Sequence, residues 1–138
     1  MTFREKIAVL TLIANVLIYG AYFGDTTLGV LDGVYALDQG YLIQTIVMLI
    51  VVVIAGSIVL GIFAGREADA PADERDRLVA MRADQRAGYV VAFGAGASLV
   101  MAIAGLSVFW IANTVLAGLV AGEMLKSLST LIDYRRGV

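Results

Sequence analysis

The chain has 138 residues, and hydrophobic residues make up 60% of them. With a mean hydropathy of +0.88, this composition is too apolar for a soluble domain of this length, so we expect an integral membrane protein in contact with membrane lipid. Cys and His are both absent, which excludes disulfides, thiol and imidazole catalysis, and Cys/His zinc sites. The net charge of -2 leaves no large basic surface for binding nucleic acid.

Four apolar stretches each approach the roughly 20 residues that a helix needs to cross the hydrocarbon of a bilayer. They predict transmembrane helices at about residues 5–23, 41–64, 87–110 and 112–132, within a single domain that covers residues 1–138. We therefore expect an all-α fold, an antiparallel four-helix membrane bundle. The first stretch follows basic residues as a secretory signal would, but Ala21-Tyr22-Phe23 offers no clean cleavage site, so we expect a retained helix.

The basic residues predict the orientation in the membrane. All ten fall on one side of the predicted helices: Arg4, Lys6, Arg66, Arg75, Arg77, Arg82, Arg86, Lys126, Arg135 and Arg136. Lys and Arg accumulate in cytoplasmic loops, so we expect a multi-pass protein of the inner (cytoplasmic) membrane with both termini in the cytoplasm. Two predicted belts of aromatic residues agree with this, an outer one of Tyr22, Phe23, Tyr41, Phe109 and Trp110 and an inner one of Phe3, Phe63, Tyr89 and Tyr134.

The outer connection at residues 24–40 contains three acidic residues, Asp25, Asp32 and Asp38. Their spacings of seven and six residues match no calcium-binding loop. We therefore expect a solvated loop and no metal site, and no motif elsewhere predicts a cofactor.

The segment at residues 65–86 is the only substantial polar element between the predicted helices. Pro71 and Asp73 mark a helix start, because Asp73 can cap the free amides of a first turn. We expect a helix from about Asp73 that runs into the third membrane span. One face of it would carry Arg75, Arg82 and Arg86, and a second, mildly apolar face would carry Glu74, Leu78, Met81 and Gln85.

Two interpretations of this cytoplasmic helix remain open. In the first, its alternating charges only keep an ordinary helix solvated, and its arginines fix the membrane topology of the chain. Alternatively, the helix meets lipid headgroups or a cytoplasmic partner, through a candidate interaction site of Asp73, Glu74, Arg75, Asp76, Arg82 and Arg86.

Several short motifs in the second half of the chain resemble a known family. The run Asp73-Glu74-Arg75-Asp76 is followed by Arg82 and by Gly88-Tyr89 at the start of a membrane helix, and Tyr134-Arg135-Arg136-Gly137 stands near the end. This pattern is similar to a widespread family of small four-helix prokaryotic membrane proteins that has no established catalytic residues. Members are often encoded near a small helix-turn-helix regulator, so the resemblance implies that the charged segment holds such a cytoplasmic regulator at the membrane.

Ionisable residues inside a membrane are costly and point to functional sites. Glu123 lies near the middle of the fourth predicted helix, and Lys126 lies one turn closer to the cytoplasm, where the two can pair at i,i+3. Asn15, Ser98 and Glu123 are each about ten residues from the cytoplasmic end of their helix, so they could meet at the midplane. With Lys126 and Ser127 they form a predicted intramembrane polar site.

This polar site has two interpretations. In the first, Glu123 has a structural role and stabilises the packing of helices, where Asn15, Ser98 and Lys126 hold it. Alternatively, it is the proton or cation site of a small transporter, which would act as a homodimer because four helices rarely enclose a substrate path.

Small residues predict where helices approach closely. Gly20 with Gly24, Gly61 with Gly65, and Gly118 with Gly122 form GxxxG pairs, and Gly94, Gly96, Ala97, Ser98 and Gly105 thin the third helix. Whether these faces pack within one chain or between two is left open by the sequence.

The sequence as a whole predicts a noncatalytic membrane interaction or regulatory protein that presents its charged cytoplasmic helix to a partner or to the lipid surface. The alternative is a small proton- or cation-coupled transporter that uses Glu123. We do not expect an enzyme, because no nucleophile and base pair appears at membrane or interface depth.

Overall fold

The computed structural model describes residues 2–65 and 71–137, and within these ranges it contains helices but no strand. The four helices are α1 (Phe3–Leu31), α2 (Gln39–Ala64), α3 (Glu74–Ile103) and α4 (Val108–Arg136). Each is long and apolar enough to cross a membrane. The all-α class with four helices of membrane-spanning length is therefore confirmed. Part of the predicted segment at residues 65–86, including Arg66, lies outside the described residues.

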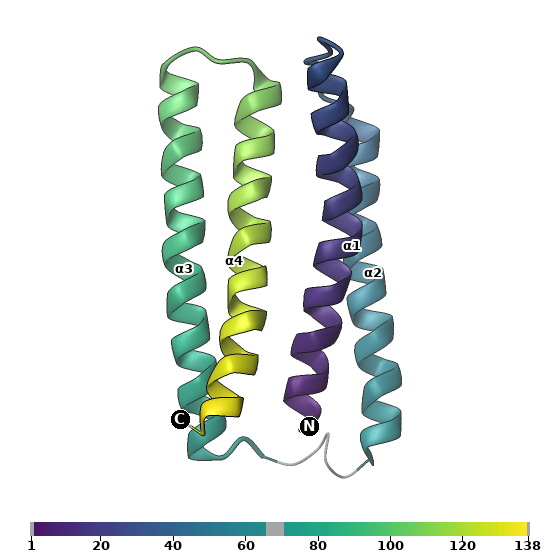
Figure 1. The fold of residues 1–138 in the computed structure, drawn as a ribbon, viewed down its shortest axis with the longest axis vertical. Helices are drawn as coiled ribbons and strands as arrows, with labels where there is room; N and C mark the ends of the chain where they lie inside the picture. The colour runs from purple at the N-terminus through teal and green to yellow at the C-terminus, as the bar shows by residue number, and fades with distance from the viewer. Residues whose placement is uncertain (1, 66–70, 138) are drawn as a thin grey trace.

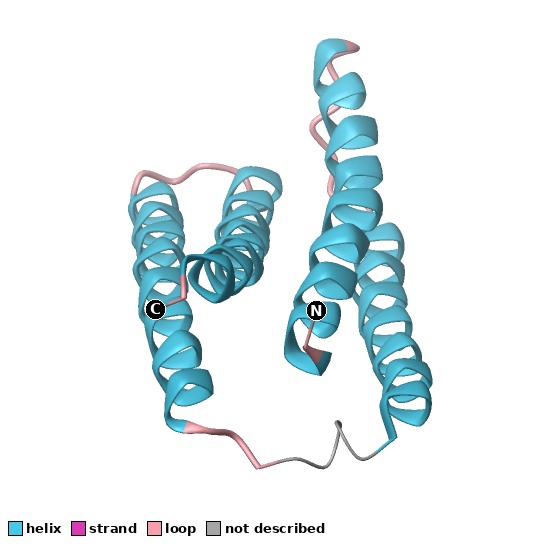
Figure 2. Ribbon diagram, turned by 60° about the horizontal axis from the view of Figure 1, so that its bottom comes forward, coloured by secondary structure: helices cyan, strands magenta, loops and turns pink. Residues whose placement is uncertain are grey.

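The helices pack as a series. α3 packs along α4, α4 also packs against α1, and α1 packs against α2. Figure 1 shows neighbouring helices running in opposite directions, with both ends of the chain at the lower end of the view. Figure 2 shows the α3–α4 pair on one side of α1 and α2 on the other. The arrangement is thus more open than the predicted four-helix bundle, because α2 makes substantial contact with α1 alone.

α1 is longer than its apolar stretch predicts. It continues past residue 23 to Leu31, so Asp25 lies on a helix and not in the expected loop. Thr26 and Thr27 lie within this continuation, and their hydroxyls donate to carbonyls one turn earlier, so these polar groups have partners inside the helix. The helix stops before Gly33, whose positive φ of 78° reverses the chain.

The turn between α3 and α4 also differs from its predicted position. α3 ends at Ile103, before Gly105 with its positive φ of 74°, and α4 begins at Val108. The sequence predicted that Phe109 and Trp110 end the third helix. In the structure they belong to the first turn of α4. The cause is local, because Gly105 adopts a left-handed backbone that ends a helix at little steric cost.

α3 and α4 approach closely at two glycines. A Cβ atom built on Gly94 would lie 2.7 Å from the Cα atom of Gly118, so each helix fits only because the other lacks a side chain there. Gly122, which forms the predicted GxxxG pair with Gly118, packs equally closely against the side chain of Val91. The prediction of close packing is confirmed for this pair and for Gly94, and this packing lies within one chain. By contrast, Gly20, Gly24, Gly61 and Gly65 have open space around them.

Candidate functional site

Residues 74–86 of the charged segment form the first turns of α3. Asp73 is the N-cap, and its carboxylate accepts a hydrogen bond from the amide of Asp76 at 2.6 Å. The carboxylate of Asp76 accepts one from the amide of Asp73 in return, which completes a capping box. The predicted helix start is confirmed, and α3 continues unbroken into its apolar part. These first turns are therefore a continuous, capped extension of a long helix, which we call the α3 extension.

Three helix ends meet at Asp76, at the end of the molecule that carries both termini. We call this end, with Arg4 of α1, Asp76 of α3 and Tyr134 of α4, the basic end. Arg4 Nε lies 3.2 Å from the Asp76 carboxylate, and the Tyr134 hydroxyl donates to the same carboxylate. Arg75 donates to the main-chain carbonyl of Tyr134 at 2.6 Å, and its guanidinium lies over the tyrosine ring.

These contacts stabilise one charge state of the cluster. The hydrogen bond from Tyr134 lowers the pKa of Asp76, and it outweighs the effect of partial burial; the Asp73 amide and the charges of Arg4 and Arg75 lower it further. Burial, together with the hydrogen bond to Asp76, raises the pKa of Tyr134. An ionised carboxylate and a protonated phenol are thus the paired forms.

A second ion pair joins α3 to α4 at this end. Arg86 Nη1 lies 2.9 Å from the carboxylate of Asp133, whose side chain is almost fully buried. Three members of the predicted interaction site, Arg75, Asp76 and Arg86, therefore make contacts with other helices of the chain. Sequence reasoning missed Asp133 as a partner, although an acidic residue directly after the fourth apolar stretch was a usable signal for a cross-helix pair.

The first turns of α3 have one buried side and one exposed side. Val79 and Ala83 are buried against the rest of the molecule, whereas Met81 is 60% exposed and Leu78 is 40% exposed. The polar residues Glu74 and Gln85 are exposed too, and Arg82 is half-buried. The mildly apolar face predicted from the sequence, which consists of Glu74, Leu78, Met81 and Gln85, is thus the outward one, and we call it the outward face.

Lys126 does not form the pair with Glu123 that the sequence allowed. Its Nζ lies 2.7 Å from the carboxylate of Asp84 on α3. In the described part of the chain, no ion pair or hydrogen bond joins Glu123 to another side chain. The physical reason is that a long Lys stem reaches a carboxylate on the neighbouring helix while both side chains stay partly exposed.

Glu123 instead lies beside Asn15, in a groove between α1, α2 and α4. Two cavities of about 300 Å³ and about 130 Å³ share Asn15, Leu49 and Glu123 in their lining. Asn15 is only 1% exposed. Its Nδ2 donates to the carbonyl of Thr11 at 2.8 Å, but its Oδ1 has no hydrogen-bond partner. The structure therefore brings two of the five predicted intramembrane residues together.

The other predicted members of the intramembrane site lie apart from this groove. Ser98 is buried on α3 and donates to the carbonyl of Gly94 at 2.8 Å, next to the close α3–α4 contact. Ser127 is also buried. Neither lines the cavities that hold Asn15 and Glu123, so the predicted meeting of Asn15, Ser98 and Glu123 does not occur. Ser98 cannot join it because α4 lies between α3 and α1.

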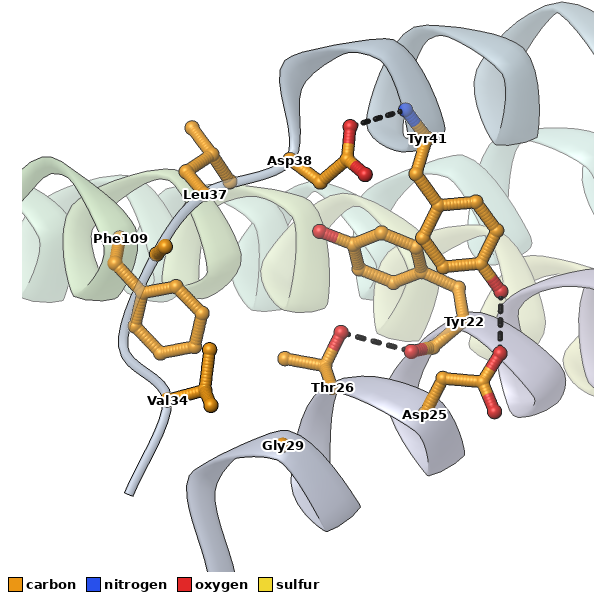
Figure 3. A pocket seen from close by; sticks show the side chains of 10 residues that line it. Tyr22, Asp25, Thr26, Gly29, Val34, Leu37, Asp38, Tyr41 and Phe109 are labelled. Atoms are coloured by element: carbon orange, nitrogen blue, oxygen red, sulfur yellow. Dashed lines mark hydrogen bonds between the residues drawn. The ribbon is translucent and has the colours of Figure 1, made fainter. Parts of the chain in front are cut away.

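Another cavity, of about 160 Å³, lies at the opposite end, between the end of α1 and the starts of α2 and α4. Figure 3 shows the Tyr41 hydroxyl pointing to Asp25, to which it donates at 2.7 Å. Asp38 caps α2 by accepting from the amide of Tyr41 at 2.9 Å, and the Tyr22 hydroxyl donates to Asn113 at 3.0 Å. Asp25 therefore joins α1 to α2 and Asp38 caps α2, and the described residues contain no acidic cluster of metal-binding size.

No protein-family profile, curated protein or solved structure matches this chain. The resemblance to a family of small membrane proteins stays a prediction. Function is therefore inferred from the geometry of the chain itself.

Proposed function

We propose that the protein lies in the cytoplasmic membrane with its basic end and both termini in the cytoplasm. Apart from Arg66, which is outside the described residues, the Lys and Arg residues lie at the starts of α1 and α3 and in the second half of α4. These parts gather toward one end of the molecule (Figure 1). Such an asymmetry favours the cytoplasmic side.

We further propose that the protein is a noncatalytic membrane interaction or regulatory protein that holds a cytoplasmic protein through the outward face of α3. The observation that carries this proposal is the exposure of Met81 and Leu78 on a helix whose inner face is fixed by ion pairs. Exposed apolar side chains with polar neighbours suit a protein partner. A cytoplasmic regulator, as the resemblance implies, is the partner class we propose.

Rigidity supports this choice over a merely solvated helix. The capping box and the contacts of Arg4, Arg86 and Tyr134 hold the extension before any partner arrives. A surface that is already ordered loses less conformational entropy on binding. The charges on the inner face therefore position the helix, and its apolar outward residues make the contact.

The test is site-specific photo-crosslinking in native membranes. A photoreactive amino acid at position 81 should capture a soluble protein, whereas the same group at position 31, an exposed apolar site at the opposite end, should not. Leu78→Ser should reduce capture at position 81 by about tenfold, since one buried apolar side chain contributes about 1.5 to 3 kcal/mol. Capture of lipid alone, or equal capture at both positions, would show that the outward face does not hold a protein.

Transport of protons or cations is the second candidate function. The observation that favours it is Glu123, which lines an apolar groove beside the unpaired Oδ1 of Asn15 and has no ion-pair partner among the described residues. An acid in such a place is suited to a mobile counter-ion. In liposomes, proton or cation flux should be present with the wild type and lost with Glu123→Gln; absence of flux in the wild type would reject this candidate.

A further inference from the structure

The groove around Glu123 has the form of a small apolar binding site with polar groups at one place. Most of its lining is aliphatic, from residues of α2 and α4: Ile46, Leu49, Ile50, Val53, Ile54, Leu116, Leu119 and Val120. Asn15 and Glu123 belong to both cavities of the groove. Pockets for small molecules commonly combine an apolar lining with a few fixed polar groups.

Asn15 is the first observation that points to an absent ligand. It is almost fully buried, and its amide nitrogen is engaged by Thr11, while its Oδ1 accepts no hydrogen bond. Buried polar atoms are almost always hydrogen-bonded, because leaving them unpaired is costly. The atom therefore calls for a donor that the described part of the chain does not supply.

Glu123 is the second observation. It lies 15 residues after the first residue of α4 and 13 before the last, or roughly 20 Å from either helix end at 1.5 Å per residue. A carboxylate at that depth needs a counter-charge, and Lys126, whose charge also acts on Glu123, makes its close ion pair with Asp84 instead. Hydroxyls of Thr11 and Tyr19 line the cavities, but in the described residues neither donates to Glu123.

We propose that this groove binds a small amphiphilic amine whose protonated ammonium group lies between Asn15 Oδ1 and Glu123. A primary ammonium offers three N–H donors and one positive charge, which matches one neutral acceptor and one carboxylate. Its alkyl or aryl body would lie on the aliphatic lining. The proposal uses the Glu123 groove of the second candidate function, but it requires binding and not transport.

Other cationic ligands fit this groove less well. A divalent metal ion favours several oxygen ligands, and the described residues hold no cluster of three acidic side chains. A lipid headgroup stays at the membrane surface, whereas Glu123 is near the middle of its helix. A small amine on an apolar body can carry its charge to this depth.

The test measures equilibrium binding of radiolabelled hexylammonium to the full chain in lipid nanodiscs. We expect saturable binding that is weakened by about tenfold or more in Glu123→Gln and in Asn15→Leu, because a hydrogen bond to a charged group contributes enough for that factor. Gln44→Leu is the matched control, since Gln44 is an exposed amide on α2 that lies outside the groove, and it should bind as the wild type does.

A comparison of ligands on the wild type decides the case even where a variant fails to fold. Hexyltrimethylammonium keeps the charge and the chain but has no N–H donor, and hexanol has no charge, so both should bind at least about tenfold more weakly. Equal uptake of the three ligands, or unchanged binding in a folded Glu123→Gln, would overturn the proposal. Binding without flux would reject transport alone, and flux without amine binding would reject this proposal alone.

Discussion

Asp76 links local helix geometry to tertiary structure at the basic end. Its carboxylate completes the capping box of α3, accepts the hydroxyl of Tyr134 from α4 and pairs with Arg4 from α1. Three helix ends thus depend on a single ionised group. Loss of its charge weakens all three contacts together.

The stability of this cluster should depend on pH in the acidic range. Because the folded pKa of Asp76 lies below its ordinary value of about 3.9, its contribution is fully present above that value and is lost as the pH falls through the folded pKa. Tyr134→Phe removes the largest cause of the shift, so it should raise the pKa of Asp76 and move this loss of stability to higher pH. Carbon-13 NMR of the carboxyl group and thermal unfolding in detergent would measure both effects.

Tyr35→Phe is the control for this change, because Tyr35 lies at the opposite end, against Phe109 and Trp110. Its acid-unfolding profile should match that of the wild type. An unchanged pKa of Asp76 in Tyr134→Phe would show that the hydroxyl does not set the charge state of the cluster.

The sequence could not predict which residue of a neighbouring helix each side chain of the site contacts. Periodicity placed Lys126 beside Glu123 on one helix, yet Lys126 pairs with Asp84 on α3. Helical spacing describes neighbours along one helix and is silent about the helix that packs alongside. The depth argument was right for Asn15 and Glu123, which share a groove, and wrong for Ser98, because equal depth does not imply adjacent helices.

At the scale of the element, the sequence located each helix but misplaced several ends. The predicted stretches stopped where apolar residues stopped, whereas α1 continues through Asp25, Thr26 and Thr27 to Leu31. The threonine hydroxyls find partners in the preceding turn, so a polar residue does not by itself mark the end of a helix. The start of α3 was predicted well because Asp73 supplies a direct capping signal.

The close contact of α3 with α4 gives a test at this scale. Gly94→Ala would place a methyl group 2.7 Å from the Cα atom of Gly118, and we expect a loss of about 1 to 3 kcal/mol in the free energy of unfolding. Gly96→Ala, on the same helix with nothing within 4 Å, should be neutral or stabilising by up to about 1 kcal/mol. Unfolding in mixed detergent micelles measures both, and equal stabilities would contradict the close contact.

At the scale of the whole molecule, the proposed orientation can be tested because the chain has no Cys. In intact cells, Asp32→Cys, in the connection between α1 and α2, should react with a membrane-impermeant maleimide. Thr2→Cys, beside the start of α1, should react only after the membrane is opened. The reverse pattern would place the basic end outside and would remove the cytoplasmic partner from the proposed function.

The outer position of α2 has a consequence for how its sequence can change. No residue of its most apolar stretch is fully buried in the protein, so only the side of α2 that packs on α1 and lines the Glu123 groove meets a fitted protein surface. Lipid tails accept any aliphatic shape, whereas α4 must keep glycine where α3 touches it. Over evolutionary time the outward side of α2 is therefore free to exchange Ile, Val and Leu almost at random, and the record of selection on this protein should be concentrated in α1, α3, α4 and the side of α2 that faces α1.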